Sequence, residues 1–466
     1  MVDLSGYKNP PLMAIGDSLY QGVRSLTIKR ELMALSAPRQ VAEALGLLDA
    51  FTFPDPDRPI LIDLERWLRM LTDGGLTAIA ADYAANRAYW AADPRSPSKR
   101  LAFENIAIAS ASMEELWLHT SATAQAVIDG LLPLTKGDLR ADFTALQGNA
   151  SRLMQAFNTR FTLNPMGHAD LEAFSQFDWV RERAPERLLV NIGSNNGLYE
   201  MCFDANPAKR MDFGAGNANL TEFALQLDSL PVEVRHIYVN TLALPRSVAN
   251  VMPIAPDKEP PQRDYIHEYH HPGPDAYFDV YENRMGFGYG RLTGAELKAL
   301  DEDVARANAA IREAVYQYQA NRDRVRFVNL TKLLLDYDIK HLGQTAGRMV
   351  SVRNPAGHSA TIELGTKMID TSVCYRGGGL ASLDGMHLTT VGYGVLARKV
   401  IEAMEAKEGL DIADIDDQRN FDRDTLLLDP PGIWRFGLWL YRDYRRATDR
   451  PAKDSDAVLS TCARAR

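Results

Sequence analysis

The stretch Pro11-Leu-Met-Ala-Ile15, followed by Gly16-Asp17-Ser18, decides the predicted fold. The apolar run has the length of a buried strand, and a glycine with two small polar residues is typical of a tight turn. A long helical pattern follows the turn. Strand, turn and helix in this order form the unit from which parallel sheets with helical crossovers are built.

The same unit recurs along the chain. Four more apolar runs of strand length lie at 101–108, 187–192, 236–241 and 325–330, and helical patterns separate them. Strands that alternate with helices pair in parallel and are covered by helices on both faces. We therefore predict an α/β fold with three layers, α/β/α, around a mostly parallel five-stranded sheet.

The chain of 466 residues is longer than five such units require. A crossover takes about a dozen residues, but much longer stretches lie between the strands at about 20–100, 133–185 and 243–324. We interpret these stretches as large, mainly helical insertions into one domain that spans 1–407.

Two segments follow this domain. Residues 408–432 are acidic and poorly periodic and contain Pro430-Pro431, which is typical of a linker. Residues 433–466 form a basic, aromatic tail for which we predict helix. The part Trp434–Arg446 suits either a membrane interface or a groove on a partner protein, and packing on the chain's own core is the third interpretation.

The composition excludes several classes of protein. With 52 Lys and Arg against 61 Asp and Glu, the net charge is -9, so nucleic-acid binding is disfavoured. The three cysteines, Cys202, Cys374 and Cys462, are odd in number and far apart, which argues against a disulfide framework. The sequence carries no secretory signal pattern and no apolar run of the roughly 18 residues that span a membrane. We therefore expect a protein that is either cytoplasmic or already processed.

Polar side chains gather at the predicted strand ends, where catalytic groups of open α/β sheets collect. Ser18 stands at the start of a helix, and Asn195 follows Gly193-Ser194 after the strand at 187–192. Near the end of the domain, Asp384 precedes His387 by three residues, just before a helical run. An aspartate at this spacing can bond an imidazole and fix its tautomer, so a nucleophile, a base and an orienting carboxylate are all present.

Four blocks of this sequence resemble the SGNH or GDSL-type serine esterases and lipases. The first block is Ile15-Gly-Asp-Ser-Leu19, the third is Gly193-Ser-Asn-Asn196 and the last is Asp384-Gly-Met-His-Leu-Thr389; the second corresponds to 105–110. The helical pattern at 37–46 is also similar to the helix after the first block in bacterial members. The resemblance implies a flavodoxin-like SGNH core, and it covers the core blocks only.

The same resemblance implies roles for individual residues. Ser18 is the expected nucleophile, His387 the general base and Asp384 its partner. The expected oxyanion hole consists of the backbone amides of Ser18 and Ser110 and the side chain of Asn195. The supporting residues are Gly16, Asp17 and Gly193. Two positions depart from the family pattern, since Ser110 replaces a glycine and Asn196 replaces an aspartate.

These roles imply hydrolysis of a carboxylic ester through an acyl-enzyme on Ser18, with a lipid or an acylated small molecule as substrate and no metal or cofactor. Two alternatives stay open. One is an acyltransferase that passes the acyl group to an alcohol or sugar. The other is a non-catalytic binding module that keeps the fold.

Two further motifs have simpler interpretations. His267-Glu-Tyr-His-His271 contains imidazoles four residues apart, as in metal sites, but Pro272-Gly-Pro274 follows, so we interpret it as a loop. Tyr375-Arg-Gly-Gly-Gly379 lacks both the preceding strand and the following lysine of a phosphate loop. It is therefore predicted to be a flexible approach to His387.

Overall fold

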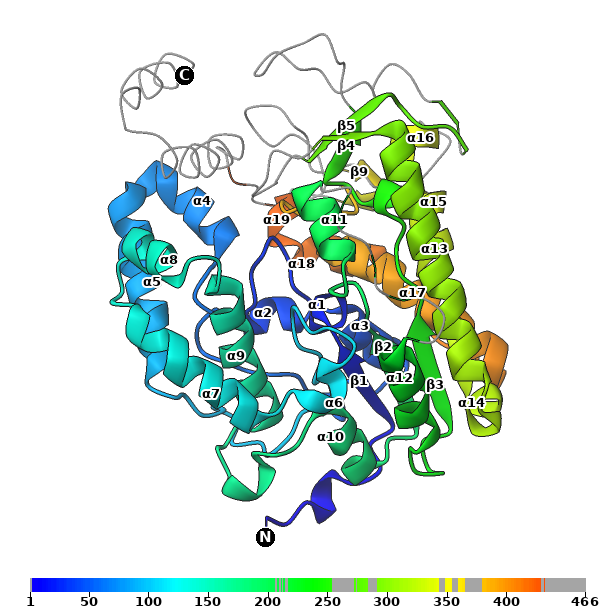
Figure 1. Ribbon diagram of the computed structural model, residues 1–466, viewed down its shortest axis with the longest axis horizontal. Coiled ribbons are helices and arrows are strands. Elements are labelled where there is room, and N and C mark those ends of the chain that lie inside the picture. The colour runs from blue at the N-terminus through cyan, green and yellow to red at the C-terminus, as the bar shows by residue number, and fades with distance from the viewer. Residues whose placement is uncertain are drawn as a thin grey trace.

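A computed structural model of the chain describes residues 2–205, 208, 211, 213, 217–253, 272–273, 275–283, 291–342, 348–353, 359–364, 379–428 and 431. At its centre lies a sheet of four strands in the order β1-β2-β3-β7 (Figure 1). The strands are β1 (Leu12–Gly16), β2 (Arg187–Asn191), β3 (His236–Asn240) and β7 (Val325–Val328). All three pairs are parallel, which confirms the predicted α/β class.

Helices cover both faces of this sheet. Alternate strand residues belong to two different hydrophobic clusters, with Met13 and Ile15 in one and Leu12 and Ala14 in the other. The first cluster includes residues of α10 (Gln176–Arg183), α12 (Ala218–Asp228) and α13 (Gly294–Tyr316). The second includes residues of α3 (Ala37–Ala44), α15 (Leu330–Asp336) and α17 (Thr390–Glu408). This arrangement fits a three-layer α/β/α fold.

The prediction of a fifth strand at 101–108 is wrong. The segment does run parallel to β1, with a hydrogen bond of 2.9 Å from Ile106 N to Ala14 O, but only an isolated bridge forms. Ile108 N also donates to Gly16 O at 2.9 Å, but the pairing stays irregular because Gly16 N donates to the side-chain oxygen of Gln176, at 2.7 Å, and not to this segment. A side chain that competes for a backbone donor in this way interrupts regular pairing.

A layer of helices stands beside the sheet (Figure 1). It contains α4 (Leu64–Asp73), α5 (Gly75–Ala91), α7 (Ser121–Leu131), α8 (Leu139–Leu146) and α9 (Ala150–Leu163). Trp90 of α5 lies 5.7 Å, between ring centroids, from both Phe157 and Phe161 of α9. These aromatic residues belong to the same hydrophobic cluster as Met13 of β1, so this layer and the sheet share one core.

Five short strands have no counterpart in the sequence prediction. One antiparallel sheet contains β4 (Val251–Pro253), β5 (Val280–Asn283) and β6 (Arg291–Thr293), and a second contains β8 (Arg348–Arg353) and β9 (Ser359–Leu364). The first of these sheets lies in the stretch at 243–324, which we interpret from the sequence as a mainly helical insertion.

Part of the predicted linker is folded. Residues 417–428 form α18 (Asp417–Arg423) and α19 (Thr425–Leu428), with Phe421, Asp424 and Leu426 buried. Asp424 accepts a hydrogen bond of 2.8 Å from the backbone of Thr390 at the start of α17. A few buried anchors thus hold this acidic segment in a folded conformation, and the assignment of 408–432 as a linker stays a prediction. The predicted tail at 433–466 lies outside the described residues.

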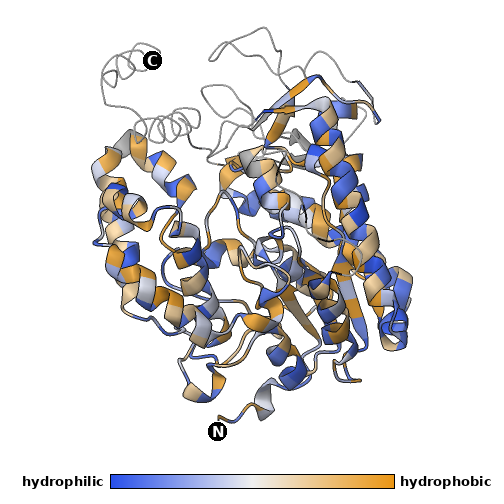
Figure 2. Ribbon diagram, viewed as in Figure 1, coloured by the Kyte–Doolittle hydropathy of each residue, from blue (hydrophilic) through white to orange (hydrophobic). Residues whose placement is uncertain are grey.

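The remaining helices are short. They are α1 (Ser18–Gln21), α2 (Arg30–Met33), α6 (Glu115–Leu118), α11 (Leu198–Asp204), α14 (Gln319–Arg324) and α16 (Ile339–Leu342). Hydrophobic and hydrophilic residues alternate along the outer helices (Figure 2), as expected for helices with one face on a core. Within the described ranges, no helix combines the length and apolar character needed to cross a bilayer.

Candidate active site

The turn after β1 holds the predicted nucleophile, Ser18. Gly16 ends the strand with φ +126°, and a Cβ at this position would lie only 1.9 Å from the carbonyl oxygen of Asn191. Only glycine fits such a close approach of two strands. The chain then enters α1, where Asp17 is the N-cap and its carboxylate accepts the Leu19 N–H at 3.2 Å. Ser18 is the first helical residue and is half-buried.

The predicted base and its partner are hydrogen-bonded. His387 Nδ1 and Asp384 Oδ2 are 2.6 Å apart, and Asp384 Oδ1 accepts the backbone N–H groups of Met386 and His387 at 2.9 and 2.8 Å. Burial opposes ionisation of Asp384, but the interactions with His387 and these N–H groups outweigh it and lower its pKa to about 2. The ionised carboxylate therefore bonds the imidazole at Nδ1, so that Nε2 is the nitrogen that can accept a proton.

Contacts between two loops bring this pair to the Ser18 end of the sheet. Leu26 N, in the segment after α1, donates to Asp384 Oδ2 at 2.7 Å. In the same segment, Ser25 N donates to Ser382 Oγ at 2.9 Å. His387 is also close enough to Asp17, the neighbour of Ser18, for the two charges to interact. None of the described residues forms a hydrogen bond with Ser18 Oγ, and such bonds often tighten only when substrate is bound.

Ser110 occupies the left-handed backbone region, which glycine adopts easily and other residues rarely do. Its φ is +67°, an uncommon value for a residue with a side chain. The surrounding loop is fixed from both sides, because Ala109 N donates to Gln21 Oε1 at 2.8 Å and Ser110 O accepts from Gln155 Nε2 at 3.2 Å. The serine thus keeps the backbone conformation, and its amide stays available.

Asn195 and Asn196 join the loop after β2 to the loop that carries Ser110. Asn195 Nδ2 donates to the carbonyl oxygen of Ala111 at 2.9 Å. Asn196 Oδ1 accepts the backbone N–H of Met113 at 2.8 Å, and its Nδ2 donates to Glu114 at 2.9 Å. An aspartate could accept but could not donate to Glu114, which gives a physical reason for the asparagine. The loops that carry Ser110 and Asn195 are therefore connected by a hydrogen bond, and Gln21 of α1, the helix that Ser18 begins, bonds the loop that carries Ser110.

A buried ionic cluster supports the same region, and sequence reasoning missed it. Arg24, in the segment after α1, donates to both oxygens of Glu65 at 2.8 Å and to Asp424 Oδ1 at 3.0 Å. All three side chains are at most 2% exposed. Burial alone would lower the pKa of Arg24, but the two carboxylates raise it, so the guanidinium stays charged. These residues are far apart in the sequence, so no local pattern indicates the cluster.

Most of the other motifs lie outside the part of the chain that the structure describes. His267–His271, the glycine-rich stretch before Gly379, Cys374 and Cys462 lie outside the described residues. Cys202 is buried, and burial raises the pKa of its thiol. Within the described part of the chain, no group of three or more His, Cys, Asp or Glu side chains could hold a metal ion.

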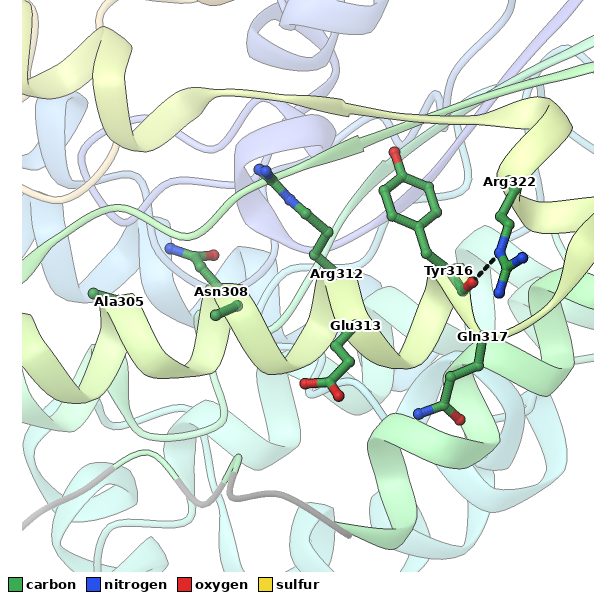
Figure 3. A pocket seen from close by; sticks show the side chains of 8 residues that line it. Ala305, Asn308, Arg312, Glu313, Tyr316, Gln317 and Arg322 are labelled. Carbon is green, nitrogen blue, oxygen red and sulfur yellow. Dashed lines mark hydrogen bonds between the residues drawn. The ribbon is translucent and has the colours of Figure 1, made fainter.

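A pocket of about 680 Å³ lies elsewhere, along α13 and beside Arg322 of α14 (Figure 3). Arg312, Tyr316 and Arg322 are among its lining residues, and Arg322 Nε donates to the carbonyl oxygen of Tyr316. Its lining contains none of the predicted site residues, so the pocket is separate from the Ser18 region.

Comparison of the chain with protein-family models, curated proteins and solved structures finds no match. The geometry at the strand ends is therefore the basis for assigning a function.

Proposed function

We propose that this protein is a serine esterase that hydrolyses a carboxylic ester of a lipid or an acylated small molecule. The observation that carries the proposal is the Asp384–His387 pair, hydrogen-bonded at 2.6 Å and held by Leu26 against the segment that follows Ser18. A nucleophile, a base and an orienting carboxylate at the carboxyl end of a parallel sheet are the parts that acyl transfer requires.

The order of segments in the sheet supports the SGNH-type resemblance. With 104–108 beside β1, the five segments lie in the order second, first, third, fourth and fifth along the chain. This is the order of flavodoxin-like sheets, which bind ligands at the switch point between the first and third segments. Ser18 follows the first segment and Asn195 follows the third, so the proposed site is at this switch point.

In the first half of the reaction, His387 Nε2 takes the proton of Ser18 Oγ as this oxygen attacks the ester carbonyl carbon. The carbonyl oxygen gains negative charge, and the amides of Ser18 and Ser110 and the side chain of Asn195 donate to it. The tetrahedral intermediate collapses when the imidazolium gives its proton to the leaving alkoxide. The products of this half are a free alcohol and an acyl group on Ser18.

In the second half, His387 takes a proton from water as the water oxygen attacks the acyl carbon. The second tetrahedral intermediate collapses by breaking the bond to Ser18 Oγ, which recovers the proton from the imidazolium. The carboxylic acid leaves and the enzyme is restored. Asp384 remains ionised throughout and stabilises each imidazolium, in agreement with its pKa of about 2.

The Ser18→Ala variant tests this proposal with p-nitrophenyl esters of increasing acyl length. We expect hydrolysis to fall at least about 1,000-fold, since only binding and oxyanion stabilisation would remain. Ser151→Ala, which changes an exposed serine of α9, is the matched control and should keep the wild-type rate. Undiminished hydrolysis by the Ser18→Ala variant would contradict the proposal.

A further inference from the structure

Polar side chains stand in a row across the carboxyl ends of three neighbouring strands. Asp17 follows β1, Asn191 ends β2 and Asn240 ends β3. Together with Tyr20 of α1 they form what we call the strand-end chain. All four residues are buried, with exposures of 0 to 4%. Buried polar groups are expected to form hydrogen bonds, and these four residues bond one another in a line that ends beside Ser18.

The hydrogen bonds of the strand-end chain all run in one direction. The Tyr20 hydroxyl donates to Asn240 Oδ1 at 3.0 Å, and Asn240 Nδ2 donates to Asn191 Oδ1 at 2.7 Å. Asn191 Nδ2 then donates to Asp17 Oδ1 at 2.6 Å. Burial raises the pKa of Tyr20, so its hydroxyl keeps the proton that begins the chain.

The last acceptor, Asp17 Oδ1, also fixes the backbone around the nucleophile. It accepts the Leu19 N–H at 3.2 Å, while Asp17 N donates to the carbonyl oxygen of Asn191 at 2.8 Å. Ser18 lies between these two bonded backbone groups. The direction of its side chain therefore depends on where Asp17 Oδ1 is held.

The geometry of Asp17, more than its charge, is suited to this task. Its Oδ2 is buried and has no hydrogen-bond partner among the described residues. Burial raises the pKa of Asp17 to about 7, against smaller opposing effects of Leu19 N–H, Asn191 and His387. Tyr20 and Tyr393 also interact with this carboxyl. The carboxyl group of Asp17 is therefore neutral in a large fraction of molecules at pH 7. Asparagine, which is neutral and has the same shape, could replace it.

We propose that the strand-end chain positions Ser18 for attack, with Asp17 as a positioning residue that acts through its hydrogen bonds. This inference rests on the proposed function, since it assigns a task at the same nucleophile. It adds Asn191, Asn240 and Tyr20 to the residues on which turnover depends, although none of them contacts the reacting atoms.

Steady-state kinetics of four variants with a p-nitrophenyl ester test the proposal. We expect Asp17→Ala to lower kcat about 100-fold, because misplacing a nucleophile by about 1 Å has an effect of this size. Asn191→Ala should lower kcat about 10-fold and Tyr20→Phe less than about 3-fold, since they act from farther along the chain. KM should stay within about 2-fold of wild type in each. Asp17→Asn, which keeps the Oδ1 acceptor, should recover most of the kcat that Asp17→Ala loses.

A matched control separates positioning from general stability. Asn321 is a fully buried asparagine of α14 whose amide donates to Ala224 O at 2.9 Å, on the opposite side of the sheet from α17. Asn321→Ala should lower the melting temperature as Asn191→Ala does but leave kcat unchanged. Melting curves also identify any variant that does not fold. In that case Asp17→Asn carries the test, because a fall of about 100-fold in its kcat would overturn the inference by making charge, and not the Oδ1 acceptor, decisive.

The outcomes distinguish the inference from the proposed function. An active wild-type enzyme with unchanged kcat in folded Asp17→Ala and Asn191→Ala variants would overturn the inference alone. Equal losses in Asp17→Asn and Asp17→Ala would also overturn it, because charge would then be the decisive property. A wild-type protein that hydrolyses none of the esters would overturn the proposed function and this inference together.

Discussion

At the scale of single residues, two aspartates near His387 have opposite protonation behaviour. Asp384 receives two backbone N–H groups and the imidazole, so its pKa falls to about 2. Asp17 is equally buried, but one of its oxygens has no partner among the described residues, and burial raises its pKa to about 7. The same type of side chain thus serves as an anion in one position and as an acceptor that is neutral below about pH 7 in the other.

The raised pKa of Asp17 predicts how stability depends on pH. Between about pH 4 and 7 the unfolded chain loses this proton while the folded chain keeps it, so folding becomes less favourable as pH rises. We expect the free energy of unfolding of Asp17→Asn to exceed that of wild type by about 2–4 kcal/mol at pH 8. Near pH 4 the two values should be equal. Urea unfolding at the two pH values measures this difference. A pH-independent difference would contradict the assignment.

At the scale of elements, the region around Ser18 is held by segments that are distant in the sequence. The Arg24–Glu65–Asp424 cluster connects the segment after α1 to α4 and to the loop between α18 and α19. Arg24 also donates to Thr390 at the start of α17, at 3.0 Å. The loop that holds His387 leads into α17, so this one side chain links both halves of the candidate site.

Removal of the Arg24 guanidinium should therefore lower the free energy of unfolding strongly. Arg24→Met leaves Glu65 and Asp424 buried without their cation, and we expect a loss of about 3–5 kcal/mol in the free energy of unfolding. The control is Lys332→Met, which removes an exposed partner of Asp336 at 2.7 Å and should cost less than about 1 kcal/mol. Urea unfolding compares the two variants, and equal losses would contradict the role assigned to the cluster.

At the scale of the whole molecule, the sequence predicts the strands that depend on short local patterns. The runs at 187–192, 236–241 and 325–330 contain the strands β2, β3 and β7, as short apolar runs that alternate with helices predict. The run at 101–108 has the same local pattern, but the side chain of Gln176, about 70 residues later, takes the donor that a strand would need. A contact between residues so far apart in the sequence produces no local sequence pattern.

In the candidate site, too, some residues are predicted from local patterns and others are recognised only in the structure. Ser18, Asp384 and His387 are recognised from short motifs, because a turn and a helix start lie close to each of them in the chain. Asn191 and Asn240 look like ordinary strand-end residues, and only the register of β1, β2 and β3 brings them into line with Asp17. The folding of 417–428 likewise depends on Asp424 reaching Arg24 across 400 positions.

The central claim is that Ser18 is an activated nucleophile, and covalent labelling tests it most directly. The wild-type protein is treated with a fluorophosphonate, digested and mapped by mass spectrometry, with the Ser18→Ala variant alongside. We predict one stoichiometric adduct on the peptide that contains Ser18 and none in the variant, since only a serine activated by a base reacts rapidly with such a reagent. A wild-type protein that stays unmodified at Ser18 would contradict the account.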